Sequence, residues 1–275
     1  MAFRGRGPKD LRRPGRTPLL RRRIEWYHWL GVVKMGGGRT RRGGLGLVAA
    51  VVGAMAVGQW LGRTAGSTRG ERRRPLPGDE LVDRPTVVTN HAVPIPAPPE
   101  RVWPWLVQMG WHRGGWYTAR WVDRLLFPAN WPSATRLVPE LQRPLRVGDR
   151  IPDGRPGTAW FVVEHVDPPH LLVLHSTTHL PAAWKERLGA SIDWAWTFTL
   201  AGTGDGGTRL LLRVRGRTGP WWLTAAYVAA LVPADYVMAS SMLKGIRRRA
   251  LRPGAVTLPG WWCGGRGRRP PRRGG

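Results

Sequence analysis

The feature that most constrains this chain is a run of 20 residues without a charged side chain, residues 43–62, GGLGLVAAVVGAMAVGQWLG. At 1.5 Å per residue, a helix of this length measures about 30 Å, which matches the hydrocarbon core of a bilayer. Seven of the residues are Leu or Val, and Gln59 is the one strongly polar side chain. We therefore expect a single transmembrane helix over residues 43–62. The alternative is a soluble helix or a linker rich in Ala and Gly.

The flanks and the surface of this segment bear on its orientation and its partners. Short basic segments stay on the cytoplasmic side of a membrane, so the basic residues 1–42 favour a cytoplasmic N-terminus and an external globule. If translation begins at Met35 instead of Met1, the segment resembles a signal sequence or a signal anchor. Small side chains recur at every fourth position and favour a weakly associating homodimer: Gly46, Ala50, Ala54 and Gly58.

The charge of the chain is concentrated at its two ends. Of 275 residues, 44 are Lys or Arg and 17 are Asp or Glu, which gives a formal charge of +27. Residues 1–42 hold 13 basic and 2 acidic side chains, and residues 247–275 hold 9 basic and no acidic ones. We expect a disordered basic arm over residues 1–42 and a disordered Gly/Pro/Arg-rich tail over residues 252–275, with anionic lipid headgroups as their partner. Nucleic acid is the less economical alternative.

Between the two ends, the pattern of apolar residues predicts a domain of mixed strands and helices. Residues 63–84 are rich in turn formers and predict a linker. Alternation with a period of two predicts strands over residues 87–95, 160–166, 171–177, 192–200 and 208–215. Helical spacing predicts a short helix after the first strand and a long one over residues 236–251. The last two strands predict an antiparallel hairpin with one dry face and one wet face.

Several short motifs in this region occur together in one order. They are LPGDE (76–80), IPAPPERVWPWLVQMG (95–110), RGGWY (113–117), PELQ (139–142), VGD (147–149), IDWAWTFTL (192–200), TRLLLRVR (208–215) and VMASSMLKGIRRRA (237–250). In their order and spacing, residues 75–251 resemble the SRPBCC superfamily, the START-like and polyketide cyclase-like group of ligand-binding proteins. We place the domain itself at residues 85–251.

The resemblance implies an α+β helix-grip (START-like) fold. In this fold a curved antiparallel β-sheet wraps around a long C-terminal helix and encloses an apolar cavity. The resemblance does not imply one activity, because its members range from lipid and hormone carriers to aromatases, cyclases and subunits of oxygenases. The activity therefore has to be argued from the side chains around the cavity.

Apolar side chains that share one face of the strands and of the last helix are candidates for the cavity wall. They are Trp160, Trp194, Trp196, Phe198, Leu210, Leu212, Met238 and Met242. Gln108, after the first helix of the domain, adds a polar group. Ligand sites are mostly apolar with a few placed polar groups, so we expect these residues to bind a hydrophobic ligand. A solid core is the alternative, because a filled interior has the same pattern.

The loop over residues 108–117, QMGWHRGGWY, holds the candidates for catalysis. His112 is the natural acid or base, while Arg113 and Tyr117 would polarise a substrate. The alternative is that the aromatic residues of this loop pack in the interior and that Arg113 forms a structural ion pair.

No metal site or cofactor is expected. His170, His175 and His179 surround one strand, but the odd separation of His170 and His175 puts them on opposite faces of an extended chain. The sequence has no Ser-His-Asp signature, phosphate loop or dinucleotide fingerprint. The single cysteine, Cys263, excludes a disulfide scaffold.

Three carboxylates are candidates for a buried acid: Asp149, Glu164 and Asp193. Only Glu164 shares the strand parity of Trp160, which would aim it at the cavity and raise its pKa. A strand end that faces water is the alternative for Glu164.

These patterns predict a single-pass membrane protein whose START-like domain binds a hydrophobic small molecule or lipid. The alternative is an enzyme of the polyketide cyclase or aromatase type that acts on a hydrophobic substrate in the same cavity. A third possibility is a protein that tethers nucleic acid through its basic arms.

Overall fold

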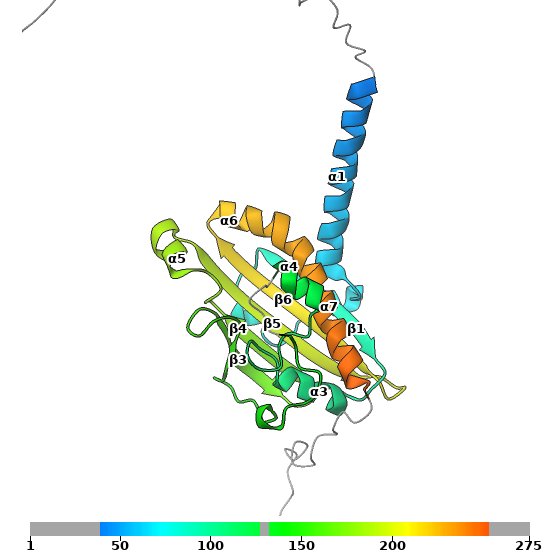
Figure 1. Ribbon diagram of the computed structural model, residues 1–275, viewed down its shortest axis with the longest axis vertical. Coiled ribbons are helices and arrows are strands. Elements are labelled where there is room, and N and C mark those ends of the chain that lie inside the picture. The colour runs from blue at the N-terminus through cyan, green and yellow to red at the C-terminus, as the bar shows by residue number, and fades with distance from the viewer. Residues whose placement is uncertain (1–38, 127–131, 253–275) are drawn as a thin grey trace, which may run out of the picture. The chain divides into compact units, whose positions relative to one another are not determined.

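The computed structural model describes residues 39–126 and 132–252 (Figure 1). Residues 49–252 belong to one compact unit and residues 39–48 to another. The basic arm and tail therefore lie outside the described residues, except for positions 39–42 and 252.

One antiparallel sheet of six strands forms the centre of the compact unit, in the order β1-β6-β5-β4-β3-β2. The strands are β1 (Val87–Ile95), β2 (Arg150–Pro152), β3 (Trp160–Asp167), β4 (Leu171–Ser176), β5 (Ser191–Gly202) and β6 (Thr208–Gly219). The predicted hairpin is the pair of longest strands, in which Trp196 is paired with Val214 and Phe198 with Leu212. Since these four side chains lie on one face, the period-two pattern produces a continuous apolar surface.

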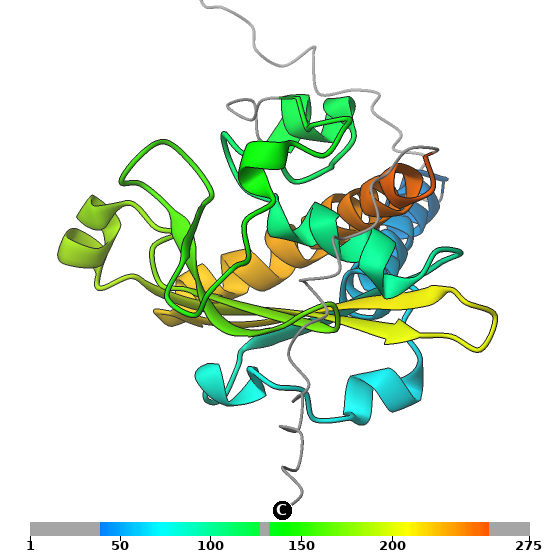
Figure 2. The same cartoon turned by 90° about the horizontal axis from the view of Figure 1, so that it is seen from below.

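Helices cover this apolar face, which we call the inner face (Figure 2). The helical segments from α3 onward are α3 (Pro99–Val107), α4 (Arg120–Leu126), η2 (Pro139–Leu141), α5 (Ala182–Leu188), α6 (Trp221–Ala226), η3 (Tyr227–Leu231) and α7 (Val232–Ala250). Met242, Leu243 and Ile246 of α7 are buried against the sheet together with Trp103 and Leu106 of α3. The predicted α+β helix-grip arrangement, an antiparallel sheet packed against a long C-terminal helix, is confirmed.

The opposite, outer face of the sheet is covered by the segment predicted as a linker. Residues 63–84 contain α2 (Arg69–Arg73) and η1 (Asp79–Leu81), which lie below the sheet in Figure 2. The guanidinium of Arg213 on β6 is 3% exposed and donates to Asp79 Oδ2 at 2.7 Å and to the Glu71 carbonyl at 2.6 Å. A buried cation needs these acceptors, so the segment packs on the sheet and the expected wet face is largely dry.

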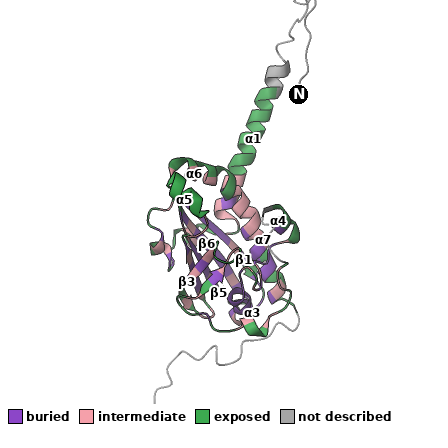
Figure 3. Cartoon of the chain, turned by 60° about the vertical axis from the view of Figure 1, so that its left-hand side comes forward, coloured by how far each residue is buried: buried purple, intermediate pink, exposed green. Residues whose placement is uncertain are grey.

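Helix α1 (Arg39–Thr64) contains the predicted transmembrane segment, and its surface is largely exposed (Figure 3). Over Gly44–Thr64 the mean hydropathy is 1.7 and none of the window is buried. Trp221–Ala250 satisfies the same length and composition criteria with a mean hydropathy of 1.3, but its Met242 and Ile246 belong to the core. Length and composition alone do not place either helix in a membrane.

The C-terminal end of α1 packs on the beginning of α7. A Cβ atom at Gly62 would lie 2.2 Å from the carbonyl oxygen of Val232, so only glycine permits this approach. At Gly58, a Cβ would lie 3.4 Å from the Pro233 ring. The last member of the small-residue stripe therefore contacts this chain's own domain.

The bidentate pair of Glu71 and Arg209 predicts a pH dependence of stability. Hydrogen bonds from Arg209, opposed by burial, lower the pKa of Glu71 from about 4.5 to about 2. Its stabilising charge is therefore fully present above pH 4.5 and is lost as the pH falls through 2.

We expect Glu71→Gln to lower the free energy of unfolding at pH 7 by about 1 kcal/mol. Urea denaturation from pH 7 to pH 2 should show this difference shrinking below pH 4.5. A difference in the free energy of unfolding that does not change with pH would contradict the pairing. An equal difference for the control Glu186→Gln, at an exposed carboxylate, would also contradict it.

Candidate functional site

A pocket of about 320 Å³ lies between the inner face of the sheet and the α6–η3–α7 segment. Its lining residues are Trp116, Thr118, Asp153, His179, Trp194, Trp196, Val214, Tyr227, Leu231, Ala234, Asp235, Met238 and Met242. Most of these side chains are apolar, and the volume suits a small organic molecule.

The sheet contributes an aromatic wall. Trp196 of β5 packs against Trp116 and Phe161, with ring centroids 5.5 and 4.8 Å apart. Trp194, two residues earlier, faces the same side and packs edge-on against Tyr227 of η3 at 5.4 Å. Period two thus places both indoles toward the pocket.

The helical wall begins with one π-helical turn, η3, between α6 and α7. The Val232 N–H donates to the Tyr227 carbonyl, five residues back. In this register the partner of the Val228 carbonyl would be Pro233, which has no N–H. Gln59 Nε2 of α1 donates to the Val228 carbonyl instead. The one strongly polar side chain of the apolar segment thereby holds α1 to the pocket's helical wall.

His179 supplies the imidazole of the pocket and is held at both ring nitrogens. Nε2 lies 2.8 Å from Asp153 Oδ2, and Nδ1 lies 2.8 Å from Ser176 Oγ. The carboxylate is an acceptor, so Nε2 carries a proton. The three residues do not form a hydrolase triad, because Ser176 Oγ donates to the Trp160 carbonyl at 2.6 Å and does not line the pocket.

Asp235 brings a second carboxylate to the pocket from the first turn of α7. Its Oδ2 accepts from Thr89 Oγ1 at 2.8 Å and lies 3.0 Å from His91 Nε2. Both partners are on β1, so these contacts join the beginning of α7 to the edge of the sheet.

Three indole N–H groups around the pocket have no acceptor among the described residues. They belong to Trp116, Trp194 and Trp196, and all three nitrogens are buried. A buried donor without an acceptor costs about 1–3 kcal/mol. Because neighbouring protein atoms cover each of these nitrogens, a molecule in the pocket contacts the ring surfaces and not these N–H groups.

Of the nine residues predicted to line the cavity, the structure brings four together around the pocket: Trp194, Trp196, Met238 and Met242. Phe198, Leu210 and Leu212 share the same face but are fully buried in the core. Gln108 is also buried, but away from the pocket. Its Oε1 accepts from the Val138 N–H at 3.0 Å, and its Nε2 donates to the Arg136 carbonyl at 3.3 Å.

Trp160 and Glu164 require a correction, because both lie on the outer face. Phe161 and Val163 are the buried residues of β3, and the register with β4 shifts at Glu164. The extra residue at this bulge changes which alternate positions of β3 face the core. Counting every second residue back from Val166, which packs against the core, therefore puts Trp160 on the wrong face. Glu164 instead lies 3.8 Å from His175, away from the pocket.

The three candidates for catalysis do not reach the pocket. Tyr117 is buried and donates to the Trp105 carbonyl at 2.8 Å, and burial raises its pKa. A Cβ at Gly245 of α7 would lie 1.9 Å from the Tyr117 carbonyl oxygen, so this contact fixes the loop on α7. His112 packs edge-on against Trp111, with ring centroids 3.8 Å apart. An acid or base at these positions stays a prediction, and His179 is the imidazole that lines this pocket.

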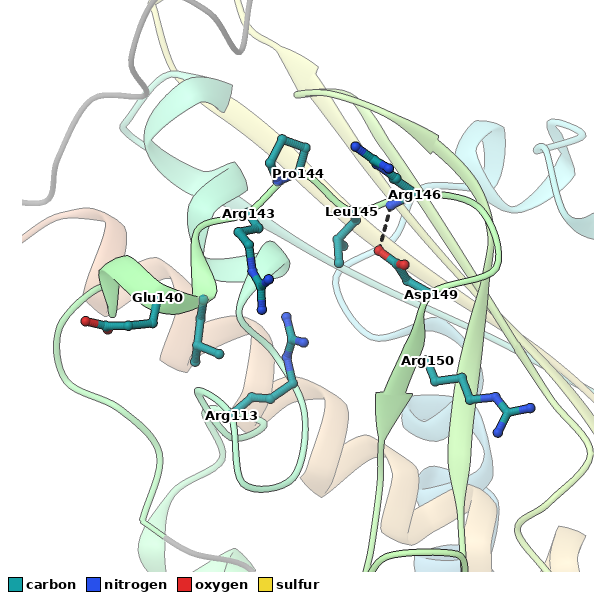
Figure 4. Close-up of a pocket in the computed structure, with 9 residues that line it drawn as sticks. Arg113, Glu140, Arg143, Pro144, Leu145, Arg146, Asp149 and Arg150 are labelled. Carbon is teal, nitrogen blue, oxygen red and sulfur yellow. Dashed lines mark hydrogen bonds between the residues drawn. The ribbon is translucent and has the colours of Figure 1, made fainter.

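Arg113 faces a different, polar hollow of about 530 Å³ beside η2 (Figure 4). Its Nη2 donates to the Val107 carbonyl at 2.7 Å, and burial lowers its pKa. The guanidinium groups of Arg113 and Arg143 point toward each other, while the Asp149 carboxylate accepts from the Arg146 N–H. The charged lining does not suit a hydrophobic ligand.

The residues that sequence reasoning missed come from separate parts of the chain. Asp153 follows β2, His179 precedes α5, Tyr227 is the first residue of η3, and Asp235 lies in the first turn of α7. These residues share no sequence motif. The one sequence signal near the π-helical turn is Pro233, which lies in the uncharged stretch of residues 218–234. Within residues 39–126 and 132–252, no group of three or more His, Cys, Asp or Glu side chains is placed to hold a metal ion.

Comparisons with known proteins give fold-level similarity only. No protein-family model and no curated protein matches the chain. The protein Mll3558 from Rhizobium loti is 14% identical with a TM-score of 0.34, over 58% of this chain and 96% of its own. The hypothetical protein jhp0584 from Helicobacter pylori is 9% identical with a TM-score of 0.41, over 64% and 95%. CalU16 from Micromonospora echinospora is 17% identical with a TM-score of 0.28, over 59% and 83%. Function therefore has to be argued from the pocket.

Truncations at Met238 and Phe198 should separate the pocket wall from the solid core. Phe198 is fully buried, so Phe198→Ala should lower the free energy of unfolding by about 3–5 kcal/mol. Met238 is half-buried and borders the pocket, so Met238→Ala should cost less than about 2 kcal/mol. Urea denaturation measures both. Equal losses would show that Met238 is packed as tightly as the core.

Proposed function

We propose that this protein is a membrane-anchored helix-grip domain of the SRPBCC type that binds a hydrophobic small molecule or lipid in the pocket beneath α7. The observation that carries the proposal is the apolar and aromatic lining of this pocket, which includes a few polar side chains. Such a lining stabilises the apolar body of a ligand and fixes its orientation through the polar groups.

The charges around the pocket select against an anionic ligand. Asp153 and Asp235 both line it, and His179 is already paired with Asp153. A carboxylate placed there would meet two like charges in an environment of low dielectric constant. We propose an uncharged ligand that carries a carbonyl or hydroxyl group for hydrogen bonds with the polar side chains of the lining.

Anchoring is assigned to α1, since its exposed apolar side chains have no protein partner over most of the described helix. A helix with this surface is more stable in lipid than in water. The basic arm would lie on the cytoplasmic side against anionic headgroups. A second copy through the small-residue stripe would add only a weak contact.

The second candidate function is that of a polyketide cyclase-like enzyme, favoured by the His179 imidazole in the pocket. Removal of a proton from carbon next to a carbonyl, attack of the enolate on a second carbonyl and return of the proton to the new alkoxide need one group that is both base and acid. Nδ1 of His179 would supply this group once the substrate takes the place of its contact with Ser176 Oγ. With a poly-β-ketone thioester as substrate, His179→Gln should then lower kcat by about 10²–10⁴-fold. Product analysis by chromatography decides: a wild-type chain that forms no cyclised product contradicts the enzyme and leaves the binding function.

Filling the pocket should abolish binding without unfolding the protein. Ala234 lines the pocket, whereas Ala230, one turn earlier, is exposed. We expect Ala234→Trp to lose a bound medium-chain methyl ketone and Ala230→Trp to retain it. The wild type should also prefer the ketone to the carboxylic acid of equal length.

Native mass spectrometry of the full chain released from detergent measures the bound fraction for each variant. Retention of the ketone by Ala234→Trp would show that the pocket is not the site. Preference for the acid would contradict the proposed ligand polarity.

A further inference from the structure

Large apolar side chains are exposed at one end of the sheet, on α5, α6 and η3 (Figure 1). We call this surface the aromatic rim; it comprises Trp184, Leu188, Trp221, Trp222 and Leu231. Trp221 is 80% exposed, whereas tryptophan side chains in folded domains are mostly buried. Several such residues on one surface mark an interaction site.

The aromatic rim borders the pocket at Leu231. Leu231 both lines the pocket and is 47% exposed, so it lies at the opening. His179 on another side is three residues from the first residue of α5. Trp184 and Trp222, with ring centroids 6.4 Å apart, join α5 to α6. Whatever covers this surface therefore lies next to the edge of the pocket at Leu231.

The distribution of charge matches a bilayer surface. Residues 218–234 contain no charged side chain. Lys185 and Arg187 are exposed on α5 and outnumber the single acidic residue there, Glu186. Indole rings prefer the interface between lipid and water, and Lys and Arg at the edge of such a surface reach the headgroups.

The contact with α1 places this surface next to the apolar helix. Gln59 donates to the Val228 carbonyl in η3, and Gly62 lies against Val232. Exposed Leu and Val side chains of α1 begin within one turn of Gln59, at Val57, and continue toward its N-terminus. A bilayer that surrounds this part of α1 therefore ends at the level of η3.

We propose that the aromatic rim inserts into the interface of the same bilayer that α1 spans, so that the pocket opens toward lipid and takes its ligand from the membrane. This inference rests on the proposed anchoring by α1. It adds a second membrane contact, made by α5 and α6, and a direction for ligand entry.

Single fluorescent labels on the full chain test the proposal. With Cys263→Ser removing the one native cysteine, a cysteine is introduced by Val52→Cys in α1, by Trp221→Cys in the aromatic rim, or by Trp121→Cys in α4. Trp121 is 59% exposed and lies outside the rim, so it is the matched control. Each protein is reconstituted into vesicles of phosphatidylcholine and phosphatidylglycerol, and quenching by brominated acyl chains is compared with quenching by aqueous iodide.

We expect acyl-chain quenching at positions 52 and 221 to be several-fold greater than at 121, and iodide quenching to show the reverse. Iodide access at 221 equal to that at 121, with 52 still inside the bilayer, would overturn the rim proposal and leave the anchor. Iodide access at position 52 would overturn the anchoring and the rim proposal together. Energy transfer between differently labelled copies at 221 would assign the surface to a second copy and overturn its contact with lipid.

The same surface should control the uptake of a ligand from lipid. Trp221→Ser and Trp121→Ser each remove an exposed indole ring, so neither should change the free energy of unfolding by more than about 0.5 kcal/mol. Uptake of a methyl ketone preloaded in the vesicles should be several-fold slower in Trp221→Ser than in Trp121→Ser. Equal rates would overturn entry through the rim.

Discussion

The packing of one long helix across one apolar sheet face determines both the core and the pocket. At its C-terminal half, α7 buries Met242, Leu243 and Ile246 against the sheet, where each side chain stabilises the fold by about 1.5–3 kcal/mol. At its N-terminal half, Ala234 and Met238 remain half-buried above the indoles of β5. The stability of the sheet–helix contact thus comes mainly from one end, and the other end is free to enclose a ligand. The π-helical turn before α7 lies at this open end.

The outer face carries a second constraint that links the domain to its N-terminal helix. Arg213 is buried and distributes its donors over Asn90, Asp79 and the Glu71 carbonyl. Removing such a cation's partners costs about 3–5 kcal/mol, so the segment between α1 and β1 is held on the sheet. Residues 63–84, which connect α1 to β1, are therefore packed on the outer face of the sheet. This packing fixes the end of α1, so Gln59 keeps its contact with η3.

The sequence predicted the framework well and the site in part, and the reasons are physical. Period two is clear in β5 and β6 because the inward residues over 192–200 and 210–214 are apolar, so the prediction places Trp194 and Trp196 on the inner face. In β3 the bulge at Glu164 reversed the parity, and no local signal announces a bulge. Arg213 has the spacing of a solvent-facing residue, since a buried ion pair and a wet strand face look alike in sequence. The pocket's polar groups, such as His179 and Asp235, meet only through tertiary structure.

The contrast between the pocket and a bilayer shows which interactions select a ligand. A molecule that leaves water for the pocket gains hydrophobic free energy, about 25 cal/mol per Å² of apolar surface. A molecule that leaves a bilayer gains almost none, because acyl chains are as apolar as the walls formed by Met238 and Met242. The equilibrium between membrane and pocket then depends on the polar contacts, which acyl chains cannot offer. Asp153, His179 and Asp235 are polar residues that line the pocket beside the apolar walls. Each hydrogen bond that a ligand makes with such a group contributes about 0.5–1.5 kcal/mol, which corresponds to a preference of about 2–10-fold. The aromatic wall therefore admits many hydrophobic molecules, and the polar groups decide which of them stay.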